Sequence, residues 1–244
     1  MYTIQRTGRT ARDVGVEMRA LVASTQPRVM AQALTFTTQR AQRAIVDEMP
    51  KVFAGGATRY TLGATRLVSA KPDSLVARVA VKDETTNNGT VPEDYLFPQV
   101  FGGGRKEKRF ERAMRYAGLL QGRERAVLGQ GAPVDAYGNL KRGEIQRILT
   151  ATRSAFDPYQ RKTSSARSRR NAKKAPYFAA RIGRTMGVWK RIGSEGEIEP
   201  ILIFVTKPPQ YRRRLDFEGI ARATAEREFP ATFARLLRKA TGAR

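Results

Sequence analysis

The sequence predicts an α+β fold, in which a mainly antiparallel sheet is flanked by a long N-terminal and a C-terminal helix. Apolar residues recur at helical spacing over residues 27–52 and again over 216–239. Short β-branched runs bounded by turn residues lie between these segments, at 65–81 and 177–206. The order of helix, strands, inserted helices, strands and helix is typical of the α+β class.

The first long helix is expected over residues 27–52. Pro27 stands where a first-turn proline is tolerated, and Pro50 is expected to close the helix. Residues 1–26 form an N-terminal segment of uncertain structure, because their apolar residues fit both a helix face and strand alternation. The apolar stripe of the helix consists of Met30, Leu34, Ala41, Ile45 and Met49.

Residues 27–240 are expected to form a single α+β domain with an insertion of helices and loops at about 83–175. Before the insertion, runs at 65–70 and 75–81 around a turn predict a hairpin. Within it, helices are expected at 106–117 and 144–156, whereas 83–104 is expected to be irregular. Five apolar residues of this irregular segment are candidates for docking on the core or on a neighbouring subunit: Tyr95, Leu96, Phe97, Val100 and Phe101.

The last third of the chain predicts three strands and a helix. The strands are expected at 177–182, 185–192 and 198–206, and the unbroken apolar run 201–205 favours a central strand that is covered on both faces. Asp216 is a good N-cap for the terminal helix, which Pro230 is expected to kink or restart.

The composition excludes most familiar catalytic chemistry. The 244 residues include no cysteine and no histidine, which excludes Ser-His-Asp triads, thiol nucleophiles and thiolate metal sites. No G-x-x-x-x-G-K-[ST] loop occurs, and no lysine has an acidic residue two positions before it, as a D/E-x-K nuclease would. We therefore expect no enzyme, with no catalytic, cofactor-binding or metal-binding residues.

The charge distribution points to macromolecular partners. The chain has 46 Lys+Arg against 22 Asp+Glu, a net charge of +24, and residues 158–194 contain no acid. A basic arm at 161–174 is open to three interpretations: a solvated loop, contact with an acidic neighbouring protein, or contact with nucleic acid. The candidate contact residues are Arg161, Lys162, Arg167, Arg169, Arg170, Lys173 and Lys174, with a second cluster at Arg212, Arg213 and Arg214.

Several stretches resemble tailed-bacteriophage tail-completion proteins of the minor tail protein Z group. The most telling are Gly187-Val188-Trp189-Lys190-Arg191-Ile192, Pro200-Ile201-Leu202-Ile203-Phe204-Val205 and Tyr211-Arg212-Arg213-Arg214-Leu215-Asp216-Phe217. Residues 41–53, 60–62, 95–100, 108–113 and 135–140 are similar to the same group. The resemblance spans most of 31–239, and it leaves out the first 25 residues and the basic arm.

The resemblance implies a virion structural protein of the phage neck or tail, which completes the tail or joins head and tail. Such a protein acts through ring-forming subunit interfaces, with a hexamer favoured by analogy. Its implied partners are itself, adjacent neck and tail-tube proteins and, as a further candidate, the DNA in the channel. No membrane, cofactor or small-molecule substrate is implied, and the protein would occupy the host cytoplasm during assembly and the virion afterwards.

The alternative hypothesis is a basic nucleic-acid-binding protein of prophage origin. A large positive net charge attracts polyanions whether or not the chain assembles into a particle. A third hypothesis, a Mg²⁺-dependent nuclease, would have to use Asp73 or Asp83, and we expect no such activity.

Overall fold

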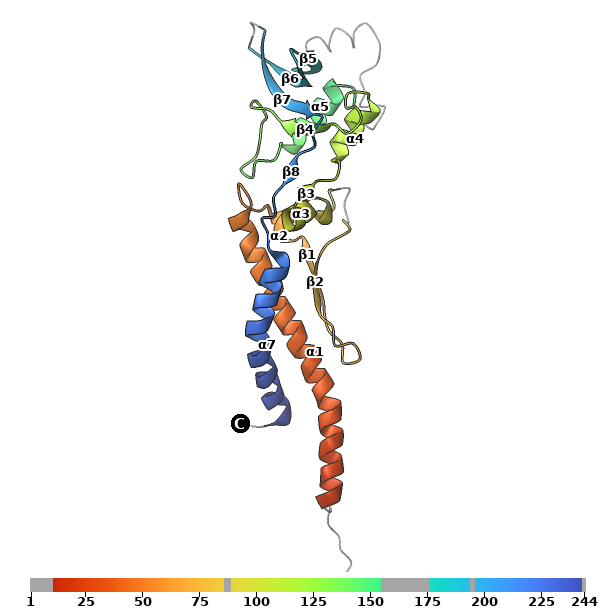
Figure 1. Ribbon diagram of the computed structural model, residues 1–244, viewed down its shortest axis with the longest axis vertical. Coiled ribbons are helices and arrows are strands. Elements are labelled where there is room, and N and C mark those ends of the chain that lie inside the picture. The colour runs from red at the N-terminus through yellow and green to blue at the C-terminus, as the bar shows by residue number, and fades with distance from the viewer. Residues whose placement is uncertain (1–10, 86–88, 155–175, 194–195, 243–244) are drawn as a thin grey trace, which may run out of the picture. The chain divides into compact units, whose positions relative to one another are not determined.

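The computed structural model describes residues 11–85, 89–154, 176–193 and 196–242, and it confirms the α+β class. The described chain divides into two compact units. We call Met1–Met49, Leu62–Lys82 and Asp216–Arg244 the helical unit, and Pro50–Thr61 and Asp83–Leu215 the sheet unit. The strands of both units pair antiparallel (Figure 1).

Helix α1, Ala11–Val52, is longer than the sequence predicts. Pro27 lies in its interior, so the interpretation of this proline as a first-turn residue is wrong. An interior proline removes one backbone hydrogen bond, and α1 continues through Pro27 with helical residues on both sides. Part of the segment whose structure the sequence left open is therefore helical. The end of α1 at Val52 agrees with the prediction.

Helix α7, Phe217–Thr241, runs antiparallel to α1 within the helical unit (Figure 1). The Asp216 side chain accepts a hydrogen bond from the Gly219 amide at 3.1 Å, which confirms the predicted N-cap. The helix continues through Pro230, so the expected restart there does not occur. The two helices bury a small apolar cluster together: Val29, Ala33 and Leu236, with Phe229, Phe233 and Leu237 packed against them.

The predicted hairpin is present, with strands shorter than expected. Strand β1, Thr65–Val68, pairs with β2, Arg78–Val81. Two hydrogen bonds attach the hairpin to α1, from the Ala70 amide to Thr35 Oγ1 at 3.1 Å and from Gln42 Nε2 to Thr65 Oγ1 at 3.0 Å.

A four-stranded antiparallel sheet organises the sheet unit, in the order β4-β7-β6-β5. Its strands are β4, Arg125–Leu128; β5, Tyr177–Ile182; β6, Thr185–Ile192; and β7, Glu197–Val205. The prediction that 201–205 is a central strand is confirmed, because β7 lies between β4 and β6. Gly187 of β6 is required by close packing, since a Cβ there would lie 2.3 Å from the Leu202 carbonyl oxygen.

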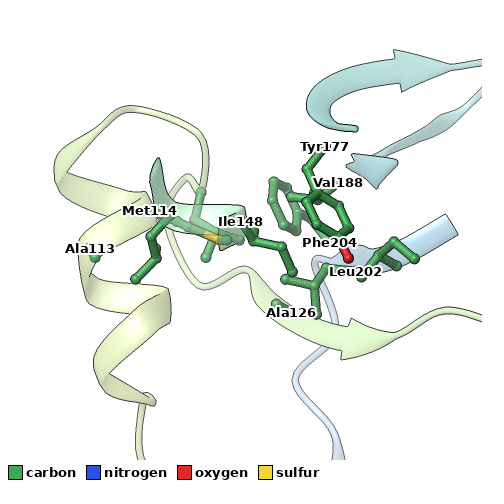
Figure 2. Close-up of a cluster of buried hydrophobic side chains, with 11 residues drawn as sticks. Ala113, Met114, Ala126, Ile148, Tyr177, Val188, Leu202 and Phe204 are labelled. Carbon is green, nitrogen blue, oxygen red and sulfur yellow. The ribbon is translucent and has the colours of Figure 1, made fainter. Parts of the chain in front are cut away.

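The core of the sheet unit lies between this sheet and two helices, α4, Arg109–Tyr116, and α5, Arg142–Ala151. Figure 2 shows the helical residues Met114 and Ile148 facing the strand residues Val188 and Phe204. The expected helices at 106–117 and 144–156 are thus present in slightly shorter form. Strand β4 was not predicted, although it completes the sheet beside β7.

The remaining elements are short: α2, Arg59–Leu62; α3, Pro92–Phe101; β3, Gly103–Gly104; and β8, Gln210–Tyr211. Residues 83–104 were expected to be irregular, and that prediction is wrong because α3 lies within them. Strand β3 pairs with β8, so the glycines after α3 are held in a small ladder.

Candidate interaction surface

Helix α3 forms where its sequence combines a helix start with an apolar stripe. Pro92 occupies the first turn, where its missing amide costs nothing, and Glu93 and Asp94 complement the positive N-terminal end of the helix dipole. Leu96 and Val100, four residues apart, are 1% and 5% exposed, so this side of the helix is buried in the protein. This burial outweighs the hydrogen bond that Pro98 removes from the helix interior.

The C-terminal end of α3 is capped by a segment distant in the sequence. The Gln99 carbonyl oxygen accepts hydrogen bonds from the amides of Arg214 at 2.8 Å and Leu215 at 3.0 Å. Carbonyls in the last turn of a helix lack partners within it, and these bonds satisfy one of them. Leu215 is fully buried, so residues 210–215 are fixed against the end of α3.

The opposite face of α3 carries two exposed aromatic side chains. Phe97 is 51% exposed and Phe101 is 59% exposed. Their ring centroids lie 4.6 Å apart with the planes tilted by 45°, as expected for residues one helical turn apart. We call these two residues the phenylalanine pair. Exposed, rigid aromatic side chains of this kind are enriched in protein interfaces.

Three exposed arginines lie near the C-terminal end of α3. Arg212, Arg213 and Arg214, which we call the arginine strip, occupy the segment that caps α3. A Cβ on Gly102, next to Phe101, would lie 3.4 Å from the Tyr211 carbonyl oxygen and 3.7 Å from the Arg213 nitrogen. The structure therefore brings together two groups of candidates from distant parts of the sequence, the docking residues and the second basic cluster.

The N-terminal end of α3 has the opposite charge. Glu93 and Asp94 lie in its first turn and are partly exposed. Asp94 Oδ1 lies 2.6 Å from Lys106 Nζ, and this hydrogen bond raises the pKa of Lys106. The first turn of α3 thus carries carboxylates, its exposed face carries the phenylalanine pair, and the segment that caps its C-terminal end carries the arginine strip.

The remaining docking candidates face the protein rather than solvent. Leu96 and Val100 are buried, and Tyr95 is partly buried, with its ring centroid 6.4 Å from that of Tyr60. Burial raises the pKa of the Tyr95 hydroxyl. The prediction of a docked apolar segment thus describes one side of α3, and the phenylalanine pair forms the other.

Not every cation of the sheet unit is available to a partner. Both terminal nitrogens of Arg105 donate to the carboxylate of Glu111, at 2.7 and 2.6 Å, and Glu111 is fully buried. The Glu111 carboxylate also accepts from the amides of Lys108 at 2.7 Å and Ala126 at 2.8 Å. Burial alone would raise the pKa of Glu111, but Arg105 and the two amides outweigh it and lower that pKa.

Gly102-Gly103-Gly104-Arg105-Lys106 looks superficially like a phosphate-binding loop, but its two cations are already paired. Arg105 is bound to Glu111 and Lys106 to Asp94, so both cations after the glycines are paired with carboxylates. The pair of Arg105 and Glu111 has a structural role, because it ties α4 to strand β4 through Ala126.

The basic arm lies outside the described residues. This applies to Arg161, Lys162, Arg167, Arg169, Arg170, Lys173 and Lys174. Among the second set of candidates, Arg212, Arg213 and Arg214 are all exposed.

Within the described residues, no group of three or more acidic, histidine or cysteine side chains is placed to hold a metal ion. A shallow groove of about 330 Å³ in the helical unit is lined by Arg28, Gln32, Thr35 and Phe36 of α1 with Ala70 and Pro72 of the hairpin. None of the helices in the described part of the chain is long and apolar enough to cross a membrane.

No protein-family model, curated protein or solved structure matches this chain. The surface on α3 is therefore interpreted from its own chemistry.

Sequence reasoning missed two parts of this surface. Glu93 and Asp94 lie in the segment that was expected to be irregular, so their place in a first helical turn was missed. Pro92 followed by two acids is a helix-start signal that would have identified it. The proximity of the arginine strip to the phenylalanine pair had no local signal, since it depends on the carbonyl of Gln99.

Proposed function

We propose that this chain is a structural protein of a phage virion, acting at the neck or tail to complete the tail or join it to the head. It would work through subunit interfaces that form a ring, with a hexamer favoured by analogy, and it would have no catalytic role, cofactor or small-molecule substrate. Its further partners would be adjacent neck and tail-tube proteins and, as an additional candidate, the channel DNA.

The observation that best supports this proposal is the surface on α3. Two phenylalanine side chains, each more than half exposed, lie on a helix that is fixed by buried Leu96 and Val100 and capped through Gln99. Aromatic and arginine side chains together are the commonest energetic anchors of protein interfaces. A surface that combines both on a rigid element is suited to holding neighbouring subunits.

The proposal is tested by locating the chain in particles. Cells that assemble the phage should release virions that contain the chain at a fixed copy number per particle. The chain should be found in the host cytoplasm before assembly and in the virion afterwards. The matched control is the same quantification for a host protein of similar size and charge, which should be absent from purified particles. Absence of the chain from purified virions would contradict the proposal.

The alternative, a nucleic-acid-binding protein, is favoured by the net charge of +24 and the acid-free stretch 158–194. Each phosphate neutralised by lysine or arginine releases counterions, so such binding weakens steeply with salt. A mobility-shift assay across a salt series distinguishes the two functions: tight, steeply salt-dependent duplex binding by the isolated chain favours the alternative.

The basic arm is tested separately. Replacing Arg167, Arg169, Arg170, Lys173 and Lys174 with serine should leave the fold intact and reduce the yield of assembled particles. Unchanged particle yield would remove the arm from the proposal.

A further inference from the structure

One end of the four-stranded sheet collects basic residues from three separate segments of the chain. Arg125 at the start of β4 pairs with Val205 at the end of β7. Gly187 of β6 pairs with Ile203 of β7, so the turn that joins β5 to β6 lies at this end of the sheet too. We call the exposed cations of these segments the basic end of the sheet: Arg123, Arg181, Arg184 and Lys207.

Arg123 belongs to a turn that two other arginines hold in place. The Arg115 guanidinium donates to the carbonyl oxygens of Gly122 at 2.6 Å and Glu124 at 3.0 Å. Arg125 Nη1 donates to the carbonyl oxygens of Glu124 at 3.0 Å and Arg123 at 3.3 Å. Because the backbone of this turn is already fixed, a partner that binds Arg123 does not have to order it.

The other three cations also belong to constrained backbone. Ile182 pairs with Thr185, so only Gly183 and Arg184 connect β5 to β6, and Gly183 adopts the positive φ of 58° that such a tight connection needs. Arg181 is the second last residue of β5. Lys207 follows β7 directly, and the two prolines after it restrict its backbone.

Carboxylates do not neutralise this end of the sheet. Among the described residues, none pairs with any of the four cations. Glu124, the acidic residue of the turn, accepts a hydrogen bond from the Gln121 amide at 2.8 Å, and Glu107 is bound to Arg115. Strands β5 and β6 lie within the stretch 158–194, which contains no acid. The basic end therefore keeps a net positive charge.

We propose that the basic end of the sheet contacts the phosphate backbone of duplex DNA. Neighbouring strands lie about 4.8 Å apart, so the four strands span about 14 Å. Duplex DNA carries one charge per about 1.7 Å of its axis, or about eight phosphates over that width. Cations at the end of a rigid sheet can neutralise several of these phosphates at once, without reading the base sequence.

Two features favour DNA over a protein partner. First, residues 121–127, 179–187 and 203–209, all of them described, include no exposed large apolar side chain, whereas a protein interface has an apolar core. Second, the opposite end of the sheet does not complement the basic end of another copy. Glu197 and Glu199 lie there, but Lys190 is paired with Glu199 across the strands and Arg191 is adjacent to it, so the four charges cancel.

This inference deepens the proposed function, because it names where the channel DNA would be contacted, and it rests on that function for its biological role. Four phosphate contacts give weak binding, with a Kd of about 10⁻⁴–10⁻⁶ M at physiological salt, which lets DNA slide past the protein. Binding by the purified chain does not depend on the role in the virion. The two therefore fail separately: DNA contact without incorporation into virions, or incorporation without DNA contact, are distinguishable results.

The test is the fluorescence anisotropy of a labelled 20-base-pair duplex titrated with the purified full chain at salt concentrations from 50 to 200 mM. The variant replaces the four cations of the basic end with serine. Each neutralised phosphate adds about 0.9 to the slope of log K against log salt, so the variant should lower the magnitude of that slope by about 3.6. Across this salt range the wild type should accordingly lose about 100-fold more affinity than the variant.

Two further variants separate a local contact from the overall charge. The matched control replaces three arginines and one lysine that are exposed on α7 with serine, and it should lower the slope by less than about 1. A third variant combines Arg123→Lys, Arg181→Lys and Arg184→Lys and should keep the wild-type slope, because lysine also binds phosphate as a point charge. Circular dichroism of each variant confirms that the fold is retained. The four control residues are Arg222, Arg235, Arg238 and Lys239.

Three results would overturn the proposal. The first is a wild-type chain that does not bind the duplex at 50 mM salt. The second is an equal change of slope in the basic-end variant and in the α7 control, which would assign the binding to the overall charge. The third is unchanged duplex binding in the basic-end variant together with lost binding of polyglutamate, which would assign this end of the sheet to an acidic protein.

Discussion

Two regions of the sheet unit use arginine in opposite ways. Arg105 is almost buried, with 9% of its side chain exposed, and it binds the fully buried carboxylate of Glu111. The arginine strip is exposed on a backbone that is fixed by two hydrogen bonds to the Gln99 carbonyl. The first region holds the fold together, whereas the side chains of the second are expected to add little to its stability. Net charge alone therefore overstates how many cations are available for binding.

The largest expected effect comes from breaking the buried pair. Replacing Glu111 with glutamine leaves the buried Arg105 without its counterion, which should lower the free energy of unfolding by about 3–5 kcal/mol. Denaturant unfolding measures this loss. The control is Glu107→Gln, which removes a pair with Arg115 whose side chains are 22% and 28% exposed and should cost about 1 kcal/mol or less, because Arg115 keeps its hydrogen bonds to the carbonyls of Gly122 and Glu124. A loss below about 1 kcal/mol in the Glu111 variant would show that this region does not support the fold.

Because of the buried pair of Arg105 and Glu111, the protein is expected to lose stability in acid. Because the pKa of Glu111 lies below its ordinary value of 4.5, the unfolded chain binds a proton more readily than the native chain. The contribution of Glu111 is therefore complete above about pH 4.5 and is lost as the pH falls through the lowered pKa. Thermal unfolding across this range should show a smaller decline for Glu111→Gln than for the wild type.

Neighbouring residues of α3 give the sharpest contrast between buried and exposed positions. Leu96 is 1% exposed, so Leu96→Ala should cost about 2–5 kcal/mol of unfolding free energy by lost burial and cavity formation. Phe97 is 51% exposed, and Phe97→Ser should change the free energy of unfolding by about 0.5 kcal/mol or less. Equal losses in the two variants, measured by denaturant unfolding, would mean that Phe97 belongs to the core.

A smaller effect is expected in alkaline solution. Burial and the hydrogen bond that Tyr177 donates to Glu144 raise the pKa of the Tyr177 hydroxyl to about 12. Its stabilising contribution is complete below the ordinary value of 10 and is lost as the pH rises through about 12. An absorbance titration should show a tyrosine component that ionises near pH 12, and Tyr177→Phe should remove that component. A titration without that component would contradict the hydrogen bond.

The smallest effect on the fold is expected at the arginine strip. Arg212→Ser combined with Arg214→Ser should change the free energy of unfolding by about 0.5 kcal/mol or less, because both side chains are exposed and the segment is held by backbone bonds to Gln99. A large loss of stability would place these arginines in the fold instead of at an interface.

Elements with a strong local signal were predicted well. Strands β5 and β6 and the cap at Asp216 follow from apolar runs bounded by turn residues and from a capping side chain. Proline misled the prediction at Pro27, which was interpreted as a first-turn residue although α1 extends before it, because the apolar residues before Pro27 fit both a helix and a strand. Strand β4 is only four residues long and begins with arginine, so nothing in its sequence marks it.

The candidate surface was only half predictable. The phenylalanines and the arginines were each recognised by residue type, but which side of α3 would be exposed depended on a helix that was not predicted. Their proximity depends on two backbone hydrogen bonds to one carbonyl, and backbone contacts between distant segments leave no pattern in the side chains.

The claim that this chain acts as a structural part of a virion is tested most directly by imaging purified particles in which the chain carries a label. The account predicts label at the junction of head and tail in every particle. Particles without label, together with the labelled chain bound to nucleic acid in the producing cell, would contradict it.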